Sequence, residues 1–181
     1  MTQVLGAVLA GGRSRRFGSD KALAVVGSQP LLSHAIDTLR DVTQAIVVCG
    51  REWPNEISLE DRPAPDMGPL GGLSAALHYG QQNGFEWVLT LACDTPFGSS
   101  TVLSDLIRRQ EAAFVDRHPV IGLWPTKACE ALDQLLVADG KHSLRAFGRS
   151  IAAAPLQTST NIANFNFEMD LQRWLAGPES I

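Results

Sequence analysis

Short apolar runs alternate along the chain with segments whose apolar residues recur at the spacing of a helix. Runs at 4–9, 45–49, 87–93 and 118–124 predict strands, and a further run at 162–167 predicts another. Helical spacing, with Ser or Pro at several of the expected starts, predicts helices at 30–40, 72–79, 100–110, 129–137, 143–148 and 169–175. Strand and helix therefore alternate over most of the chain.

This alternation predicts an α/β fold with a mostly parallel, twisted sheet flanked by helices on both faces. The run at 4–9 is apolar at both alternating sets of positions, as in a strand buried on both faces. The chain has 181 residues, enough for one substantial core but short for two, so residues 1–181 are expected to form one domain. Open α/β sheets bind ligands beyond the carboxyl ends of their strands, so functional residues are expected directly after strands.

Composition and charge exclude several classes of partner. Hydrophobic residues make up 45% and charged residues 19% of the chain, as in ordinary globular proteins. The formal net charge is -4, which provides no general field for nucleic acid or an anionic membrane, so neither is expected as a partner. An anionic ligand must therefore be held by local charge.

The cysteines and the N-terminal residues indicate the cellular compartment in which the protein works. Cys49, Cys93 and Cys129 are odd in number and far apart, which favours neither a disulfide framework nor a zinc site and fits a reducing environment. The N-terminus has no pattern of a secretory signal, and no apolar run approaches about 18 residues. A cytoplasmic location away from membranes is expected.

The loop after the first strand combines paired glycines with basic residues. Gly11 and Gly12 are followed by Arg13, Arg15, Arg16 and Lys21. Paired glycines allow successive backbone N–H groups to converge on an anion, and Arg16 and Lys21 are candidates to neutralise a triphosphate. The spacing matches neither a P-loop nor a dinucleotide-binding fingerprint. A solvated turn is the alternative, but so many cations and glycines in an acidic chain favour a phosphate site.

Two later loops also follow predicted strands. Asp61 leads to a segment at 66–73 with three glycines beside a helix start, where backbone groups can receive a base, ribose or phosphate; a plain capped loop is the alternative. Asp94 ends the third strand and is the candidate ligand for Mg²⁺, which commonly takes one or two carboxylates together with substrate phosphates. Asp94 as a turn cap is the other interpretation. Cys93 is expected to pack in the core rather than act as a nucleophile.

Four segments, at 9–21, 68–70, 93–96 and 164–166, together resemble the molybdenum cofactor guanylyltransferases. The first has the pattern Leu-Ala-Gly-Gly-x-Ser-x-Arg-x-Gly-x-Asp-Lys, and the match in order and spacing covers most of the chain. The resemblance implies a Rossmann-like α/β nucleotidyltransferase domain. In it, GTP and molybdopterin, or Mo-molybdopterin, react to give a guanine dinucleotide with release of pyrophosphate.

The resemblance also implies roles for individual residues. The residues expected to bind GTP are Leu9, Ala10, Gly11, Gly12, Lys21 and Asp61. Asp94 is expected to hold Mg²⁺, and Asn166 or Asn164 to lie near the metal or the acceptor. The expected catalytic residues are Lys21, Asp94 and Arg16. Molybdenum-insertion proteins and molybdoenzyme chaperones are the implied protein partners.

The sequence departs from the family pattern in two places. Phe17 stands where relatives usually have methionine, an apolar exchange that should preserve packing. The segment at 47–51 lacks the nucleotide-contacting asparagine that relatives often carry, so backbone groups of Cys49 and Gly50 are expected to replace it. Arg51 and the pair at 118–119 are candidates to contact the acceptor, with a plain surface role as the alternative.

Attack by an acceptor phosphate on the α-phosphorus of GTP needs no protein nucleophile, because the attacking oxygen is already anionic. The alternatives are the same chemistry with CTP, a sugar phosphate acceptor, or a nucleotide-binding regulator without catalysis. Cytidylyltransferases of this type tend to carry Ala-Ala-Gly where this chain has Ala10, Gly11 and Gly12, which favours a purine.

Overall fold

The computed structural model describes residues 2–11, 20–96, 100–138, 142–165 and 168–176. The strands are β1 (Val4–Leu9), β2 (Val25–Val26), β3 (Gln29–Pro30), β4 (Ala45–Cys49), β5 (Ile57–Leu59), β6 (Trp87–Ala92), β7 (Ala113–Val115), β8 (His118–Pro125) and β9 (Ala154–Leu156). The α-helices are α1 (Leu31–Arg40), α2 (Gly68–Gln82), α3 (Ser100–Arg109), α4 (Cys129–Val137), α5 (Leu144–Ser150) and α6 (Glu168–Ala176). Two short 3₁₀ turns, η1 (Lys21–Leu23) and η2 (Thr126–Ala128), complete the list.

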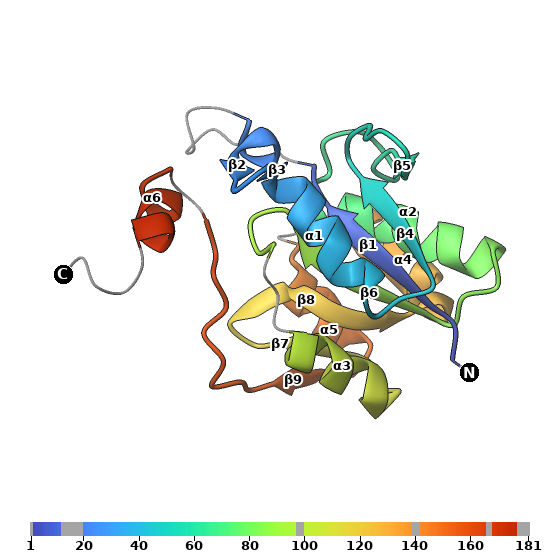
Figure 1. Cartoon of the computed structure of the whole chain (residues 1–181). Helices are drawn as coiled ribbons and strands as arrows, with labels where there is room; N and C mark the ends of the chain where they lie inside the picture. The colour runs from blue at the N-terminus through green and yellow to red at the C-terminus, as the bar shows by residue number, and fades with distance from the viewer. Residues whose placement is uncertain (1, 12–19, 97–99, 139–141, 166–167, 177–181) are drawn as a thin grey trace.

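Seven strands form one sheet in the order β5-β4-β1-β6-β8-β7-β9, and β2 pairs with β3 in a separate hairpin (Figure 1). The pairs β5–β4, β4–β1, β1–β6 and β7–β9 are parallel, whereas β8 runs antiparallel to both of its neighbours. The expected α/β fold with a mostly parallel sheet is confirmed. Its parallel half brings the carboxyl ends of β1, β4 and β6 to one edge, where the ligand site of such a sheet lies.

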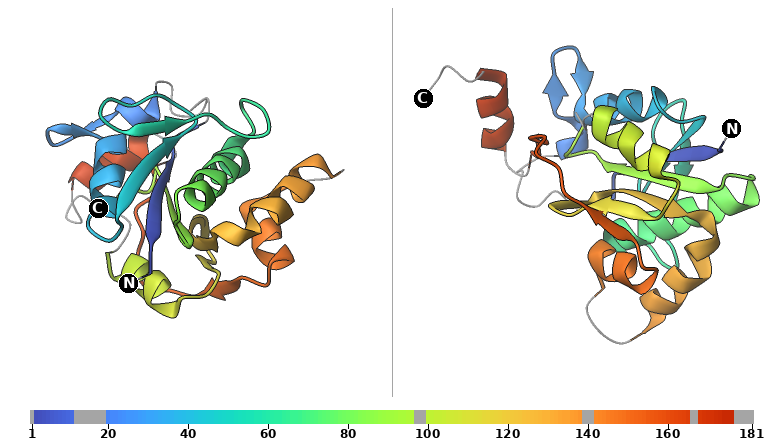
Figure 2. Two further views of the ribbon diagram at one scale, coloured as in Figure 1. Left: turned by 90° about the vertical axis from the view of Figure 1, so that its right-hand side faces the viewer. Right: turned by 90° about the horizontal axis from the view of Figure 1, so that it is seen from below.

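Helices cover both faces of the sheet. Alternate residues of the central strand β1 are therefore buried against helices on opposite sides. Val4 and Val8 of β1 pack in one apolar cluster with α1 and α3, and Leu5 and Leu9 pack in another with α2, α4 and α5. Figure 2 shows α1 and α2 on opposite sides of β1. All six residues of β1 are buried, which explains its unbroken apolar sequence.

Several predicted elements match the structure closely, whereas the helix expected at 72–79 spans Gly68–Gln82 and the short strands β2, β3, β5, β7 and β9 were not predicted. The helices at 100–110 and 129–137 and the strands at 4–9 and 45–49 are found within a residue of their expected ends. The strand expected at 162–167 is wrong for its described part, 162–165, which contains no strand.

Residues 162–165 are held in place by a backbone hydrogen bond and by apolar packing rather than by strand pairing. The backbone N–H of Phe165 donates to the carbonyl of Asp94 at 2.9 Å, and the Phe165 ring packs with Val26, Leu31 and Leu171. Phe165 thus attaches this connecting segment to the loop after β6. The same apolar cluster holds α6 beside the β2–β3 hairpin (Figure 1).

The structure also bears on the cysteines and on membrane-spanning helices. The cysteines Cys49, Cys93 and Cys129 are free and buried, so none is part of a disulfide. Within the described ranges, no helix has the length and apolar character needed to cross a bilayer.

Candidate active site

A cavity of about 660 Å³ opens at the carboxyl ends of β1, β4 and β6. The ends of these strands, the loops that follow them and the loop after β5 line one end of it with Leu9, Ala10, Gly11, Asp20, Lys21, Cys49, Asp61, Cys93 and Asp94. This is the place that the fold predicts for a ligand. Of the residues expected to act on the nucleotide, Gly12 and Arg16 lie outside the described residues.

The loops after β1 and β4 touch through glycine backbones. The N–H of Ala10 donates to the carbonyl of Cys49 at 2.9 Å. Gly50 has φ +84, and a Cβ placed on it would lie 2.5 Å from the Cα of Gly11. Only glycine satisfies both the left-handed backbone and this close approach, so the end of β4 supports the start of the glycine-rich loop. This backbone contact lies in the segment 47–51, where the asparagine expected from the family pattern is missing.

Asp61 is a partly buried carboxylate packed against glycines. A Cβ on Gly11 would come within 3.6 Å of its Oδ1, and a Cβ on Gly71 within 2.9 Å of its Cβ. Its Oδ1 is buried and accepts no hydrogen bond from the described residues. Burial is the main cause that raises the pKa of Asp61 above its ordinary value of 3.8; the charge of Asp66 adds to it, while the N–H groups of Met67 and Gly68 oppose it. An unpartnered acceptor beside a cavity calls for a ligand that donates hydrogen bonds.

Helix α2 begins beside Asp61 without a side-chain cap. It starts at Gly68, four residues earlier than expected, with Pro69 in the first turn and no acidic residue there. Gly68, Pro69, Leu70 and Gly72 line the cavity. The expected helix start beside the aspartate therefore faces the cavity, and the N–H groups of Met67 and Gly68 are directed to the Asp61 carboxylate.

Lys21 and Asp94 meet at the centre of this end of the cavity, 73 residues apart in sequence. The Lys21 Nζ lies 2.9 Å from the Asp94 Oδ2, and their side chains are only 14% and 24% exposed. Asp20, the neighbour of Lys21, caps η1 through the N–H of Ala22 and pairs with Arg51 at 3.0 Å. The two ion pairs fix the far end of the glycine-rich loop on the loops after β4 and β6.

The surroundings of Asp94 fit Mg²⁺ shared with a nucleotide. Among the residues that the structure describes, no three His, Cys, Asp or Glu side chains gather into a ready-made metal site. One carboxylate together with phosphate oxygens is a common way to hold Mg²⁺, and Asp94 already faces a cation, the Lys21 ammonium. The donor set is therefore suited to a metal that arrives with a triphosphate.

Cys93, beside Asp94, is unsuited to act as a nucleophile. Burial is the main cause that raises the pKa of its thiol to about 11, with the Asp94 charge adding to the effect. A thiol must lose its proton to attack, so Cys93 stays protonated and inert near neutral pH. The prediction that it packs in the core is confirmed by its 9% exposure.

The other end of the cavity comes from elements other than the loops at the ends of β1, β4 and β6. The β7–β8 turn and the start of β8 supply Arg117, His118, Pro119 and Val120, and the approach to α5 supplies His142, Ser143, Leu144 and Arg145. Asn164 lies in the same cavity, and its Oδ1 is buried without a hydrogen-bond partner in the described part of the chain. Sequence reasoning found His118, Pro119 and Asn164. It missed the two arginines and His142, because isolated polar residues in loops carry no short pattern.

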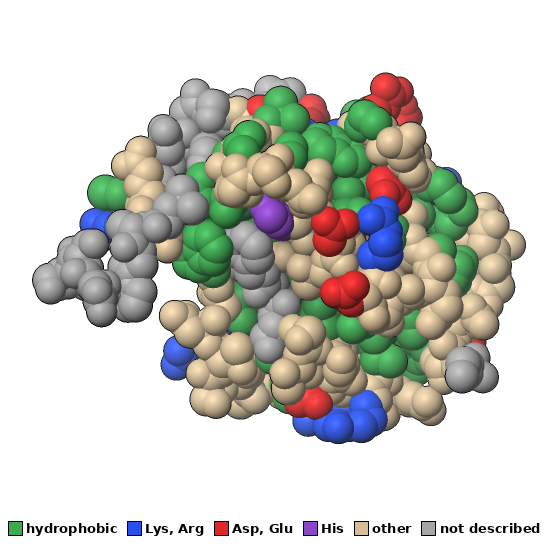
Figure 3. Space-filling model, in the orientation of Figure 1, with side chains coloured by type: hydrophobic (Ala, Val, Ile, Leu, Met, Phe, Trp, Pro, Cys, Tyr) green, Lys and Arg blue, Asp and Glu red, His purple; other side chains and the backbone are tan. Residues whose placement is uncertain are grey.

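Arg51 occupies a different position from the pair at 118–119. It lines a neighbouring pocket with Gly50 and Asp61, and it pairs with Asp20. The structure thus puts the pair at 118–119 in the main cavity and Arg51 in the neighbouring pocket, beside the glycine-rich loop. Over the face that carries α1, acidic and basic side chains are mixed (Figure 3), so that face presents no broad field of one sign.

Comparison with known proteins agrees with this geometry. The model of the MobA-like NTP transferase domain matches residues 6–155. A molybdenum cofactor guanylyltransferase from Rhizobium leguminosarum bv. trifolii is 35% identical over 81% of this chain and 75% of its own, and one from Acidiphilium cryptum is 30% identical over 94% and 93%. The crystal structure of molybdopterin-guanine dinucleotide biosynthesis protein A from Archaeoglobus fulgidus superimposes with a TM-score of 0.73 at 17% identity, covering 94% of this chain and 96% of that one. The chain belongs to the molybdenum cofactor guanylyltransferases, within the MobA-like NTP transferase family.

Proposed function

We propose that this protein transfers GMP from GTP to the terminal phosphate of molybdopterin or Mo-molybdopterin and releases pyrophosphate. The product is the molybdopterin guanine dinucleotide. The observation that carries the proposal is the Lys21–Asp94 pair, set between the start of the glycine-rich loop and a second, separately built half of one cavity. A transferase that joins two substrates must bind one on each side of the reacting phosphate groups, and the two halves of this cavity provide space for both.

The proposed reaction is an in-line attack by an acceptor phosphate oxygen on the α-phosphorus of GTP. The backbone at 9–11 and the Lys21 ammonium bind and orient the triphosphate, together with Gly12 and Arg16. Mg²⁺ on Asp94 would supply charge compensation for the phosphates. Catalysis then rests on positioning and electrostatic stabilisation, because the attacking oxygen needs no protein base and the neighbouring thiol stays protonated.

Asp61 is proposed to read the guanine base. Guanine offers an N1–H and an exocyclic amine as adjacent donors, and a carboxylate can accept from both. The unpartnered Oδ1 of Asp61, bordered by Gly11 and Gly50, has the opposite polarity to these donors. Cytosine has no ring N–H donor beside its amine, so the same carboxylate would favour GTP over CTP.

On the acceptor side, Asn164 and Asn166 are proposed to contact the acceptor near the metal. The Asn164 Oδ1 supports this role, because it is a buried acceptor within the cavity. The three buried free thiols fit a reducing compartment, so we expect the reaction to take place in the cytoplasm.

Pyrophosphate release measured with different donor nucleotides tests the proposal. Purified protein with Mg²⁺ and molybdopterin is expected to release pyrophosphate with GTP and far less with CTP, ATP or UTP. Release with CTP alone would assign the protein to the cytidylyl reaction. No release with any donor, beside an active guanylyltransferase as control, would refute molybdopterin as the acceptor.

A further inference from the structure

The two ends of the cavity differ in the charges that line them. The carboxylates that line it, Asp20, Asp61 and Asp94, all belong to the nucleotide end. At the opposite end, the charged lining residues in the described ranges are Arg117 and Arg145, and His118 and His142 lie with them. Asp116 pairs with Arg145 from outside the lining, so two arginines stand against one carboxylate and this end keeps an excess of positive charge in a chain of net charge -4.

We infer that Arg117, His118, His142 and Arg145 form a second anion-binding pole, which holds an anionic group of the acceptor other than the phosphate that reacts. The inference rests on the proposed function, because the acceptor phosphate must meet the α-phosphorus of GTP beside Lys21 and Asp94. The rest of the acceptor then extends into the other half of the cavity. The group bound there is negatively charged and electron-rich, a thiolate sulfur or an oxyanion.

Arg145 is held in place before any ligand arrives. Its guanidinium donates to the Asp116 carboxylate and to the Asp116 backbone carbonyl, and the Gln157 amide donates to the same carboxylate at 3.0 Å. It also lies 6.0 Å from the centre of the Phe114 ring. A guanidinium has five N–H groups, so donors remain for a ligand. Because its position is already fixed, binding costs less side-chain entropy.

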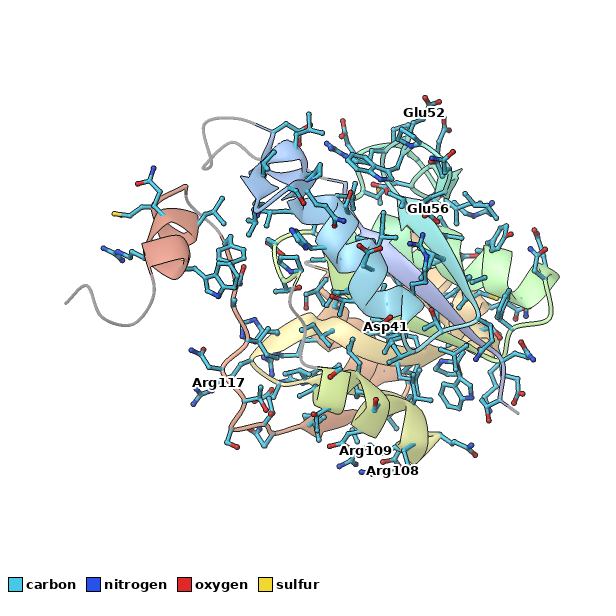
Figure 4. The ribbon with its side chains drawn as sticks, viewed as in Figure 1. Asp41, Glu52, Glu56, Arg108, Arg109 and Arg117 are labelled. Atoms are coloured by element: carbon cyan, nitrogen blue, oxygen red, sulfur yellow. The ribbon has the colours of Figure 1, made fainter. Side chains whose placement is uncertain are left out.

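The histidines and Arg117 add donors that a ligand can recruit. His142 Nε2 lies 2.8 Å from the carbonyl of Ala138, and a carbonyl only accepts, so this nitrogen carries the hydrogen. Nδ1 faces a ligand as an acceptor in the neutral ring and as a donor in the protonated ring, so an anion recruits the protonated form. Arg117 is exposed on the β7–β8 turn, well apart from Arg108 and Arg109 at the end of α3 (Figure 4). It is therefore a residue that can be replaced with little risk to the fold.

Two single variants and a matched control test the inference. Arg117→Gln and His142→Gln alter the pole, whereas Arg108→Gln removes a surface arginine on α3 whose side chain is 79% exposed. Binding of molybdopterin is measured without nucleotide, through the change in pterin fluorescence, and binding of GTP by calorimetry. Each pole variant is expected to raise the Kd for molybdopterin about tenfold, with the Kd for GTP and kcat unchanged. Arg117→Lys should restore most of the affinity.

The outcomes separate this inference from the proposed function. Wild-type protein that releases pyrophosphate from GTP and molybdopterin, with pole variants that bind molybdopterin as tightly as Arg108→Gln does, would overturn the pole and leave the reaction standing. Wild-type protein that neither binds molybdopterin nor releases pyrophosphate would overturn both. Equal loss of GTP and molybdopterin affinity in the pole variants would also contradict a pole specific to the acceptor.

Discussion

Asp94→Asn is expected to lower kcat by about 10³-fold at saturating GTP and molybdopterin. The substitution keeps the shape of the side chain but removes the charge that pairs with the Lys21 Nζ at 2.9 Å and would hold Mg²⁺. The affinity for Mg²⁺ should fall as well, because a neutral amide is a weak ligand for a hard cation. Steady-state pyrophosphate release over a series of Mg²⁺ concentrations measures both effects.

Asp105→Asn provides the control for this variant. Asp105 is an acidic residue on α3 that pairs with Arg108 on the surface, so it tests the loss of a carboxylate and an ion pair away from the cavity. A thermal melt of both variants shows whether the fold is intact. Near-normal turnover of a folded Asp94→Asn protein with Mg²⁺ would remove Asp94 from the reaction.

Asp61→Asn is expected to weaken GTP binding at least about tenfold and to reduce the preference for GTP over ITP. ITP lacks the exocyclic amine of guanine, so it reports one of the two donors proposed for the Asp61 carboxylate. Calorimetry with both nucleotides, on wild type and variant, measures the effect. Wild-type protein that binds GTP and ITP equally but discriminates against 2′-deoxy-GTP would place Asp61 on the ribose instead.

The raised pKa of Asp61 sets the direction of two pH effects. Guanine donors require the ionised carboxylate, so GTP affinity should fall as pH drops through this pKa. In the protein without nucleotide, the folded state keeps its proton above the ordinary value of 3.8, where the unfolded chain has lost it. This group therefore makes stability decline as pH rises through that interval, and Asp61→Asn should abolish its contribution. The carboxylate thus opposes stability in the empty protein and is expected to be compensated when a base donates to it.

The central strands could be predicted because burial on both faces leaves an unbroken apolar run. β1 and β4 show this, and β6 does so apart from the buried Thr90; their order with the helices predicted a parallel sheet. β5 and β9 have three residues each and are partly exposed, so they leave no such pattern. The antiparallel direction of β8 could not be predicted from the sequence either, because a buried strand has the same apolar pattern in both directions.

The site could be predicted where its residues follow strands. Lys21 and Asp94 were each expected from local patterns, and the sheet brings them together across 73 residues. The unpartnered Oδ1 of Asp61 and the cationic end of the cavity could not be predicted, because both depend on which loops meet after folding. Arg117 and Arg145, for example, lie 28 positions apart in sequence and line the same cavity.

The position of the label transferred from GTP tests the central claim most directly. GTP labelled at the α-phosphorus and GTP labelled at the γ-phosphorus are each incubated with the protein, Mg²⁺ and molybdopterin, and the products are separated. The account predicts α-label on the pterin product and γ-label in pyrophosphate. Label on the pterin from the γ-phosphorus, or unlabelled pterin in both reactions, would contradict guanylyl transfer.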